Sequence, residues 1–262
     1  MTAMKLRTLI LSGIIVSFPF WVNAQGHRGA NEPKLDKKLM ELPAFGNSDI
    51  ILVYNAFTVN YNNEWLIPNW VAYELTAEET AGEVPRANGF SMDLDYKDRQ
   101  AMREDYSNSG WDKGHLAPAS DMKWSKVAMK ESFNLTNICP QNHELNGNDW
   151  HTLEKMVRDW ANKYGNIWVV CGPYVIGNKF GTIGAQNVTV PDGFYKALLR
   201  KDGAKWRSIA FVFDNDAHKQ SVENAVVSVN DLELLIGFDL FTNLDDKIEE
   251  TVESQANWDD WK

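Results

Sequence analysis

The stretch Asp112-Lys113-Gly114-His115 places a histidine close to a carboxylate and an ammonium group. A neutral imidazole is an effective general base, because its ordinary pKa lies near neutral pH. Hydrolysis of a phosphodiester bond needs such a base, since the attacking water must lose a proton. His115 is therefore our candidate base, and Asp112 is a candidate supporting residue.

A second group follows thirty to forty residues later, where Asn146, Glu154 and Arg158 recur at multiples of four. On a helix this spacing forms one slowly drifting stripe. A hard divalent cation would stabilise the charge that develops on phosphate oxygens, and Mg²⁺ prefers oxygen ligands while it keeps several waters. Asn146, just before the helix, is the candidate ligand. Glu154 would hold a metal-bound water, and Arg158 would pair with Glu154 or contact a phosphate.

Each of these residues also has a purely structural explanation. Glu154 and Arg158 could form an ordinary salt bridge on one helix, and Asp112 could cap a turn. Trp150 is expected in the core. Spacing alone therefore leaves a metal-assisted hydrolase and structural roles both open. We expect the other histidines to be packed or surface residues: His27, His143, His151 and His218.

Taken together, the motifs resemble those of the DNA/RNA non-specific endonucleases, the ββα-metal nucleases with a DRGH signature. The similarity extends from about Tyr54 to Phe241, and the ordered set between residues 112 and 173 is specific. The matching segments are Asp112-Lys113-Gly114-His115, Leu116-Ala117-Pro118-Ala119, Asn137-Ile138-Cys139-Pro140-Gln141, Asn146 with Trp150, Leu153-Glu154, and Gly172-Pro173.

The resemblance implies a role for each matching residue. His115 would be the general base, and Asn146 would be the single direct protein ligand of Mg²⁺, with Mn²⁺ as an alternative metal. Glu154 would order the metal-bound waters. Asn137 and Gln141 would hold the His115 strand against the helix. The substrates would be DNA and RNA, and cleavage would leave a 5′-phosphate.

The basic residues complete the implied site. Arg158 resembles a basic residue of the family helix, and Arg86 would supply a phosphate contact, although the similarity around it is loose. The family arginine is replaced by Lys113, which keeps the charge but lacks the bidentate guanidinium. The reaction type is therefore a firmer expectation than the rate.

The chain has 262 residues and a formal net charge of −10, which fits one large acidic domain. Nucleic-acid binding usually relies on a basic surface, so this charge argues against broad adhesion to DNA. A phosphodiesterase or pyrophosphatase acting on small nucleotides is the first alternative. The second is an exported binding protein with a degenerate site, which the eleven tryptophans would suit.

Residues 1–24 have the pattern of a secretory signal peptide, with Lys5 and Arg7 before an apolar run and Val22-Asn23-Ala24 as a cleavage site. The apolar run is shorter than the ~20 residues of a membrane-spanning helix. We therefore expect cleavage near Ala24, a secreted or periplasmic protein and no stable membrane association. The remaining chain would carry a net charge of −12.

The remainder of the chain is predicted to form a polar arm over residues 25–44 and one domain over residues 45–262. An oxidising compartment would permit a disulfide between Cys139 and Cys171, but two buried free thiols are equally compatible with the sequence. The oligomeric state is also open, a homodimer included.

Hydrophobic patterning predicts an α+β fold with a mainly antiparallel sheet. The clearest helix spans about 148–164, with shorter helices at 124–132 and 228–236, and Asn60-Tyr61-Asn62-Asn63 is a turn signal. Residues 244–262 are acidic and are expected to form a mobile tail. The resemblance adds a β-hairpin that carries His115. The predicted strands span residues 50–54, 70–75, 167–171, 195–200 and 208–213.

Overall fold

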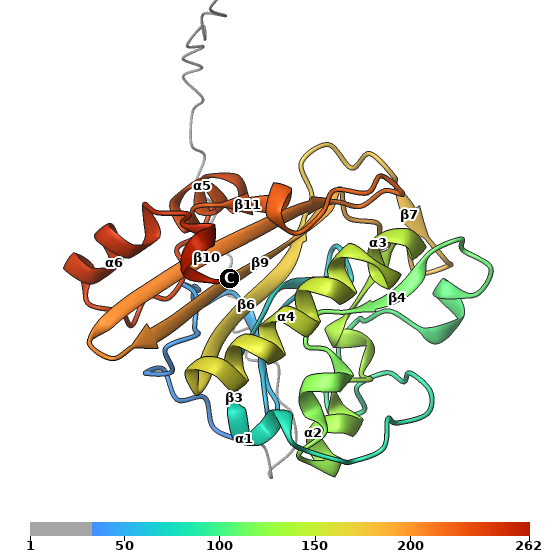
Figure 1. The fold of residues 1–262 in the computed structure, drawn as a ribbon. Helices are drawn as coiled ribbons and strands as arrows, with labels where there is room; N and C mark the ends of the chain where they lie inside the picture. Colours follow the sequence, from blue (N-terminus) through green and yellow to red (C-terminus); the bar gives the residue numbers. More distant parts are fainter. Residues whose placement is uncertain (1–32) are drawn as a thin grey trace, which may run out of the picture.

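The computed structural model describes residues 33–262, and its core is one antiparallel sheet of seven strands (Figure 1). The spatial order is β1-β2-β3-β6-β9-β10-β11, and every neighbouring pair is antiparallel. This confirms the predicted fold class. The strands are β1 (Ile50–Val53), β2 (Thr58–Asn62), β3 (Ile67–Thr76), β6 (Asn166–Tyr174), β9 (Gly193–Asp202), β10 (Lys205–Asp214) and β11 (Val226–Val227).

Two small sheets lie outside this core. β4 (Asp112–His115) pairs with β5 (Ile138–Gln141), and β7 (Thr182–Ile183) pairs with β8 (Val188–Thr189). Six α-helices are present in the described residues: α1 (Ala77–Thr80), α2 (Lys126–Glu131), α3 (His143–Gly147), α4 (Asp149–Tyr164), α5 (Val229–Ile236) and α6 (Asp246–Glu253). None of them is long and apolar enough to cross a bilayer.

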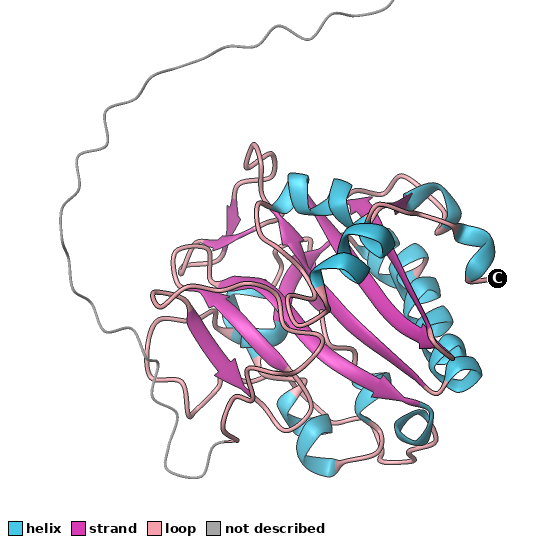
Figure 2. Ribbon diagram, turned by 90° about the vertical axis from the view of Figure 1, so that its left-hand side faces the viewer, coloured by secondary structure: helices cyan, strands magenta, loops and turns pink. Residues whose placement is uncertain are grey.

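Both faces of the sheet are covered, and helices border the strands on two sides in Figure 2. Successive residues of a strand point to opposite faces, so Val71 and Tyr73 enter one core cluster while Trp70 and Ala72 enter the other. α4 packs on the first cluster through Trp150, Leu153, Val157, Trp160 and Ala161. Truncating one of its buried residues, such as Leu153→Ala, would cost about 2–5 kcal/mol of stability.

The long helix and its end agree with the sequence. Gly165 terminates α4 with φ 96°, where an L-residue would be strained. The turn signal was placed too early, since Asn60 and Tyr61 pair with β3 inside β2. Pairing with a neighbouring strand satisfies the backbone there, and the chain turns only after Asn62.

The acidic tail is the main correction to the predicted organisation. Residues 246–253 form α6, and Trp261 is 1% exposed. Its ring lies 5.0 Å from that of Trp160, whose indole nitrogen donates to the Trp261 carbonyl. The acidic composition of this segment suggested a mobile tail, but Trp258 and Trp261 pack against Trp160 and attach the segment to α4.

The N-terminal segment also reaches the fold. Leu42 is buried in the second core cluster, and the amide of Ala44 donates to the carbonyl of Asp239 at 2.8 Å. Residues 33–49 therefore lie beside the loop after α5. The predicted signal peptide, residues 1–24, and the first part of the predicted arm fall outside the described residues.

The two cysteines are both buried and free, so the disulfide alternative is not realised. Cys139 belongs to β5 and Cys171 to β6, which are strands of different sheets. The thiol of Cys171 instead donates to the carbonyl of Leu116 at 3.2 Å. Burial raises the pKa of Cys171 to about 11, which keeps it an unreactive thiol.

Candidate active site

His115 ends β4 and lies inside an aromatic cluster. Its ring is 4.9 Å from that of Phe133 and 5.2 Å from that of Phe90. Backbone hydrogen bonds between Ser91 and the segment after α2 hold the two phenylalanines side by side. His115 is 8% exposed, and burial, followed by the positive charge of Arg86, lowers its pKa to about 3. The imidazole is therefore neutral across the physiological range.

The acceptor of this imidazole is uncommitted. Nε2 of His115 is buried and makes no hydrogen bond within residues 33–262. Unpartnered buried polar atoms are uncommon, because each forfeits a hydrogen bond to water. A neutral histidine has the protonation state that a general base requires.

Asn137 fixes the chain directly after His115. Its amide oxygen accepts from the backbone nitrogen of Ala117 at 3.0 Å, and its amide nitrogen donates to the Ala117 carbonyl at 2.9 Å. The same nitrogen donates to the carbonyl of Ser132 at 2.8 Å. Asn137 thus ties the end of β4 to the turn after α2, whereas the resemblance implied a tie to the long helix.

Gln141 determines why residue 114 is a glycine. Gln141 pairs with Asp112 across β4 and β5, and its side chain reaches along β4, so that a Cβ at Gly114 would lie 2.2 Å from Oε1 of Gln141. Both side-chain polar atoms of Gln141 are buried and without hydrogen-bond partners among the described residues. The Gln141 side chain therefore occupies the space that any larger residue at 114 would need.

Asp112 joins β4 to the candidate metal ligand. Its Oδ2 accepts from Nδ2 of Asn146 at 2.9 Å, and it lies 2.9 Å from Nδ1 of His143. This contact orients the Asn146 amide, so that its oxygen is left to accept from or coordinate another group. His143 is an exposed surface residue, as expected, but the hydrogen bond to Asp112 raises its pKa.

The helix that carries the candidate residues is divided. Asn146 lies in α3, while Glu154 and Arg158 lie in α4, and Asn148 between them leaves helical geometry with φ −119° and ψ −89°. The predicted single stripe is therefore broken at Asn148. The Glu154 side chain is 11% exposed, and its carboxylate lies 3.8 Å from Nδ1 of His151.

Arg158 has a different partner from the one expected. Its guanidinium donates to Oδ1 of Asp121 at 2.8 Å, and Tyr73 donates its hydroxyl to the other carboxylate oxygen at 2.9 Å. Burial raises the pKa of Asp121 to about 6, although Arg158 opposes this shift. The predicted salt bridge with Glu154 is replaced by this pair, since Asp121 is completely buried and needs a counter-charge more.

Two cations surround the aromatic cluster of His115. The Arg86 guanidinium lies 5.0 Å from the Phe133 ring, and Nζ of Lys113 lies 5.8 Å from the Phe90 ring and 5.2 Å from the Tyr106 ring. Burial, followed by the charge of Arg103, lowers the pKa of Lys113. Arg86 is exposed beside the site and can reach an incoming anion.

The structure thus gathers the candidate residues into three groups. His115, Lys113 and Arg86 share the aromatic cluster, Asp112 holds Asn146, and Arg158 stands near Glu154. β4 connects the first two groups, and the α3–α4 segment connects the last two. The sequence did not single out several further residues of these groups, because they lack a motif spacing: Tyr73, Phe90, Asp121, Phe133 and, as a partner of Asp112, His143.

Comparison with known proteins agrees with this arrangement. The sequence profile of the DNA/RNA non-specific endonucleases matches residues 38–247. The chain belongs to this family. It is thereby placed in a family of metal-dependent enzymes that hydrolyse nucleic acids, which confirms the resemblance drawn from the motifs.

Individual relatives are similar over most of the chain. Mitochondrial nuclease EXOG of Mus musculus is 32% identical over 73% of this chain, and a nuclease of Nostoc sp. is 30% identical over 79%. The alignments cover 57% and 78% of those proteins, so the chain spans little more than half of the length of EXOG. A solved complex of EndoG with EndoGI matches with a TM-score of 0.72 and 26% identity, over 79% of this chain and 91% of that one.

These relatives overturn one expectation. We predicted a secreted or periplasmic protein, but EXOG and the endonuclease G of Bos taurus, 31% identical over 67% of this chain and 63% of that protein, are mitochondrial by name. An apolar N-terminal run alone does not specify one destination.

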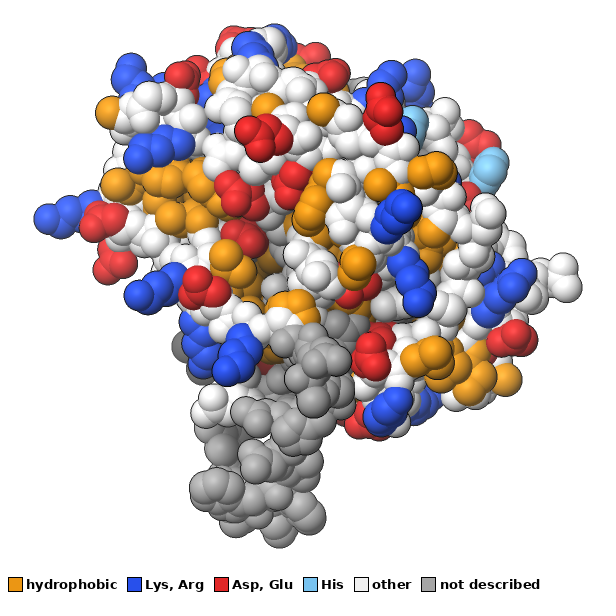
Figure 3. Space-filling view, turned by 90° about the horizontal axis from the view of Figure 1, so that it is seen from below, with side chains coloured by type: hydrophobic (Ala, Val, Ile, Leu, Met, Phe, Trp, Pro, Cys, Tyr) orange, Lys and Arg blue, Asp and Glu red, His pale blue; other side chains and the backbone are white. Residues whose placement is uncertain are grey.

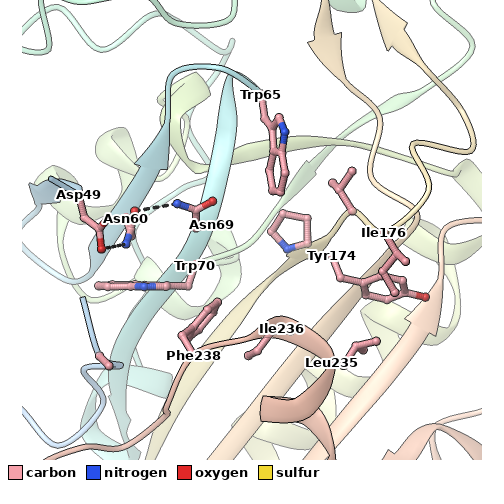
Figure 4. A pocket seen from close by; sticks show the side chains of 13 residues that line it. Asp49, Asn60, Trp65, Asn69, Trp70, Tyr174, Ile176, Leu235, Ile236 and Phe238 are labelled. Atoms are coloured by element: carbon pink, nitrogen blue, oxygen red, sulfur yellow. Dashed lines mark hydrogen bonds between the residues drawn. The ribbon is translucent and has the colours of Figure 1, made fainter. Parts of the chain in front are cut away.

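A cavity of about 270 Å³ elsewhere on the sheet is separate from the His115 site (Figure 4). Trp65, Trp70 and Phe238 line it, together with the amides of Asn60 and Asn69. Asn69 donates to Asn60 at 2.9 Å. No histidine, lysine or arginine is among the described residues that line the cavity, so these residues offer no cation for a phosphate.

Proposed function

We propose that this chain is an endonuclease that hydrolyses phosphodiester bonds of DNA and RNA, with His115 as general base and Asn146 as the ligand of one divalent cation. The observation that carries the proposal is the β4 strand. It holds a neutral, buried His115 at one end and, at the other end, Asp112, which orients the Asn146 amide.

The donors present fit a hard cation. The Asn146 amide oxygen accepts no hydrogen bond within residues 33–262, and Glu154 adds a carboxylate on the following helix. Oxygen donors with little direct protein ligation suit Mg²⁺, and Mn²⁺ is the alternative. Such an ion would supply charge stabilisation at the phosphate oxygens.

The protein groups have separable tasks. His115 would accept the proton of the attacking water, because its imidazole is neutral. Arg86 and Lys113 would attract the phosphate backbone, which carries no base information, so sugar type and sequence should matter little. Asp121 would neutralise Arg158 and fix the position of its guanidinium beside α4. Arg158 would then be a positioning residue near Glu154.

Digestion of plasmid DNA and of RNA tests the proposal. We expect Mg²⁺-dependent cleavage of both that EDTA abolishes and that His115→Ala reduces about 10²–10⁴-fold. His218→Ala, an exposed histidine in the loop after β10, is the matched control and should leave the rate unchanged. Cleavage by folded protein that tolerates both EDTA and His115→Ala would overturn the proposal.

A second candidate is hydrolysis of small nucleotide phosphodiesters or pyrophosphates at the same site. The net charge of −10 supports it, and the face in Figure 3 shows acidic side chains interspersed with the basic ones. A polymer suffers more from such a field than a small substrate does. Rates on long DNA and on bis-nitrophenyl phosphate, compared at two salt concentrations, would separate the two candidates.

A further inference from the structure

Three carboxylates converge on the side of the molecule opposite β4. Glu233 lies in α5, Asp239 in the loop that follows, and Glu253 at the end of α6. One carboxylate oxygen of each lies within 4.8 Å of the other two. We call these residues the acidic trio. α5 and α6 lie together above β10 in Figure 1, far from α3 and β4.

Glu253 is the buried member of the trio. It is 2% exposed, and its Oε1 makes no hydrogen bond within residues 33–262. Ile248 and Val252 pack on the core, and the Ser208 hydroxyl donates to the Val252 carbonyl at 2.9 Å. α6 is thereby anchored on β10, which forces the carboxylate at its last residue inward.

Among residues 33–262, no basic group pairs with this carboxylate. None of the ion pairs within residues 33–262 involves a member of the trio. Burial, followed by Glu233, Glu249 and Asp239, raises the pKa of Glu253 to about 9. Without a cation, Glu253 therefore binds a proton at neutral pH, and a cation at the trio would take the place of that proton.

The backbone presents the trio as a preformed cluster. Gly237 ends α5 with φ 81°, a left-handed turn that returns the chain towards Glu233. The amide of Leu240 then donates to Oε1 of Glu233 at 2.8 Å. This bond fixes one oxygen of Glu233 and leaves the other for the cluster.

We propose that Glu233, Asp239 and Glu253 bind one Ca²⁺ ion, in a structural site separate from the catalytic centre. Ca²⁺ lies about 2.3–2.6 Å from its oxygen ligands, so oxygens on opposite sides of the ion are about 5 Å apart. The 4.8 Å span of the trio fits this size. Mg²⁺ requires a tighter octahedron, and zinc favours nitrogen and sulfur donors, which the trio lacks.

The site would hold the C-terminal segment in place. α6 leads to Trp258 and Trp261, which pack against Trp160 of α4. An ion that bridges α5, its loop and α6 would bind the folded state only. It would therefore raise the unfolding temperature in proportion to the logarithm of its concentration.

Thermal unfolding and calorimetric titration with Ca²⁺ test the site, in full-length protein that carries Asn146→Ala to remove the proposed catalytic ligand. We expect one Ca²⁺ per chain and a rise in Tm of about 5–10 °C at a hundredfold excess over Kd. Adding Glu253→Gln should abolish both. Without Ca²⁺ this variant should unfold at the same or a higher temperature, since glutamine is neutral without binding a proton on folding.

Glu250→Gln, an exposed residue of the same helix, is the control and should keep the Ca²⁺ response. If Glu253→Gln does not fold, the exposed Asp239→Asn replaces it. An absent Ca²⁺ response, or one equal in the Glu253→Gln variant, would overturn the site. So would a Tm that rises only on acidification, because the carboxyls would then share protons in place of an ion.

Discussion

Asp121 and Glu253 are two of the buried carboxylates among residues 33–262, and the charges around them have opposite signs. Asp121 sits under α4 with the guanidinium of Arg158 at 2.8 Å and the Tyr73 hydroxyl at 2.9 Å. Glu253 is the last residue of α6, and the side chains that act on its charge are all acidic. The first carboxylate is neutralised by Arg158, whereas no residue in the described part of the chain supplies a cation for the second.

The difference in counter-charge separates a carboxylate that positions structural elements from one that could bind an ion. A buried carboxylate with its own cation and hydrogen-bond donor holds two elements in a fixed relation, here α4 against β3 and the turn after β4. A buried carboxylate without one destabilises the fold until a cation or proton arrives. Matched substitutions at the two positions should therefore change stability in opposite directions.

The largest expected effect comes from Asp121→Ala. This variant leaves Arg158 mostly buried without a counter-charge and Tyr73 without its acceptor, so it should lose about 3–5 kcal/mol in urea unfolding. Asp159→Ala, at an exposed position of α4 next to Arg158, is the control and should change stability little. Equal losses for Asp121→Ala and Glu253→Gln in Ca²⁺-free buffer would remove the contrast between the two carboxylates.

The pH dependence of His115 is the next effect. Its folded pKa, about 3, lies below the ordinary 6.5, so the unfolded state binds the proton first. The stabilising contribution of neutral His115 is complete above about pH 6.5 and is lost as the pH falls towards 3. Compared with His115→Phe, which keeps the ring contacts, the wild type should therefore lose several kcal/mol over this range.

Parallel stability curves for the wild type and His115→Phe between pH 7 and pH 4 would contradict this assignment. They would mean that His115 binds its proton equally well in the folded and unfolded states. The imidazole would then be hydrated, and the aromatic cluster would not explain its role as a neutral base.

The long helix and the site motifs could be predicted from the sequence, for physical reasons. The apolar stripe of α4 has a period that no strand shares, and Gly165 ends it. The motif Asp112-Lys113-Gly114-His115 identified the strand that carries the proposed base, His115. The β4–β5 pair escaped the hydrophobic pattern, because each strand has four residues and its partner is more than twenty residues away.

Long-range pairing explains what the sequence could not provide. Arg158 lies four residues after Glu154, which suggests a local pair, yet Asp121 takes it from another element. Phe90 and Phe133 reach His115 only through folding. The segment after residue 244 was read as a tail by its charge, and two tryptophans that depend on α4 for burial make it part of the core.

A smaller effect is expected from Gly114→Ala. The added methyl would have to displace Gln141, whose Oε1 lies 2.2 Å from its position, and β4 would shift under His115. We expect a stability loss of about 1–3 kcal/mol and a larger relative loss of kcat, since small misplacements of a base are costly. Gly177→Ala, where a Cβ meets open space, is the control. An unchanged kcat in the Gly114→Ala variant would mean that Gln141 moves aside without disturbing His115.

The smallest effect tests the one departure from the family motif. Lys113 lies over two aromatic rings beside the site, and its lowered pKa reflects partial burial. An arginine there could stack on the same rings and offer a bidentate fork to a phosphate. We therefore expect Lys113→Arg to retain the cleavage rate or raise it severalfold, with Lys201→Arg at the exposed end of β9 as the control. A tenfold or larger loss for Lys113→Arg would show that the compact ammonium is required. Lys113 would then be held in place by its protein neighbours, as Arg158 is held by Asp121.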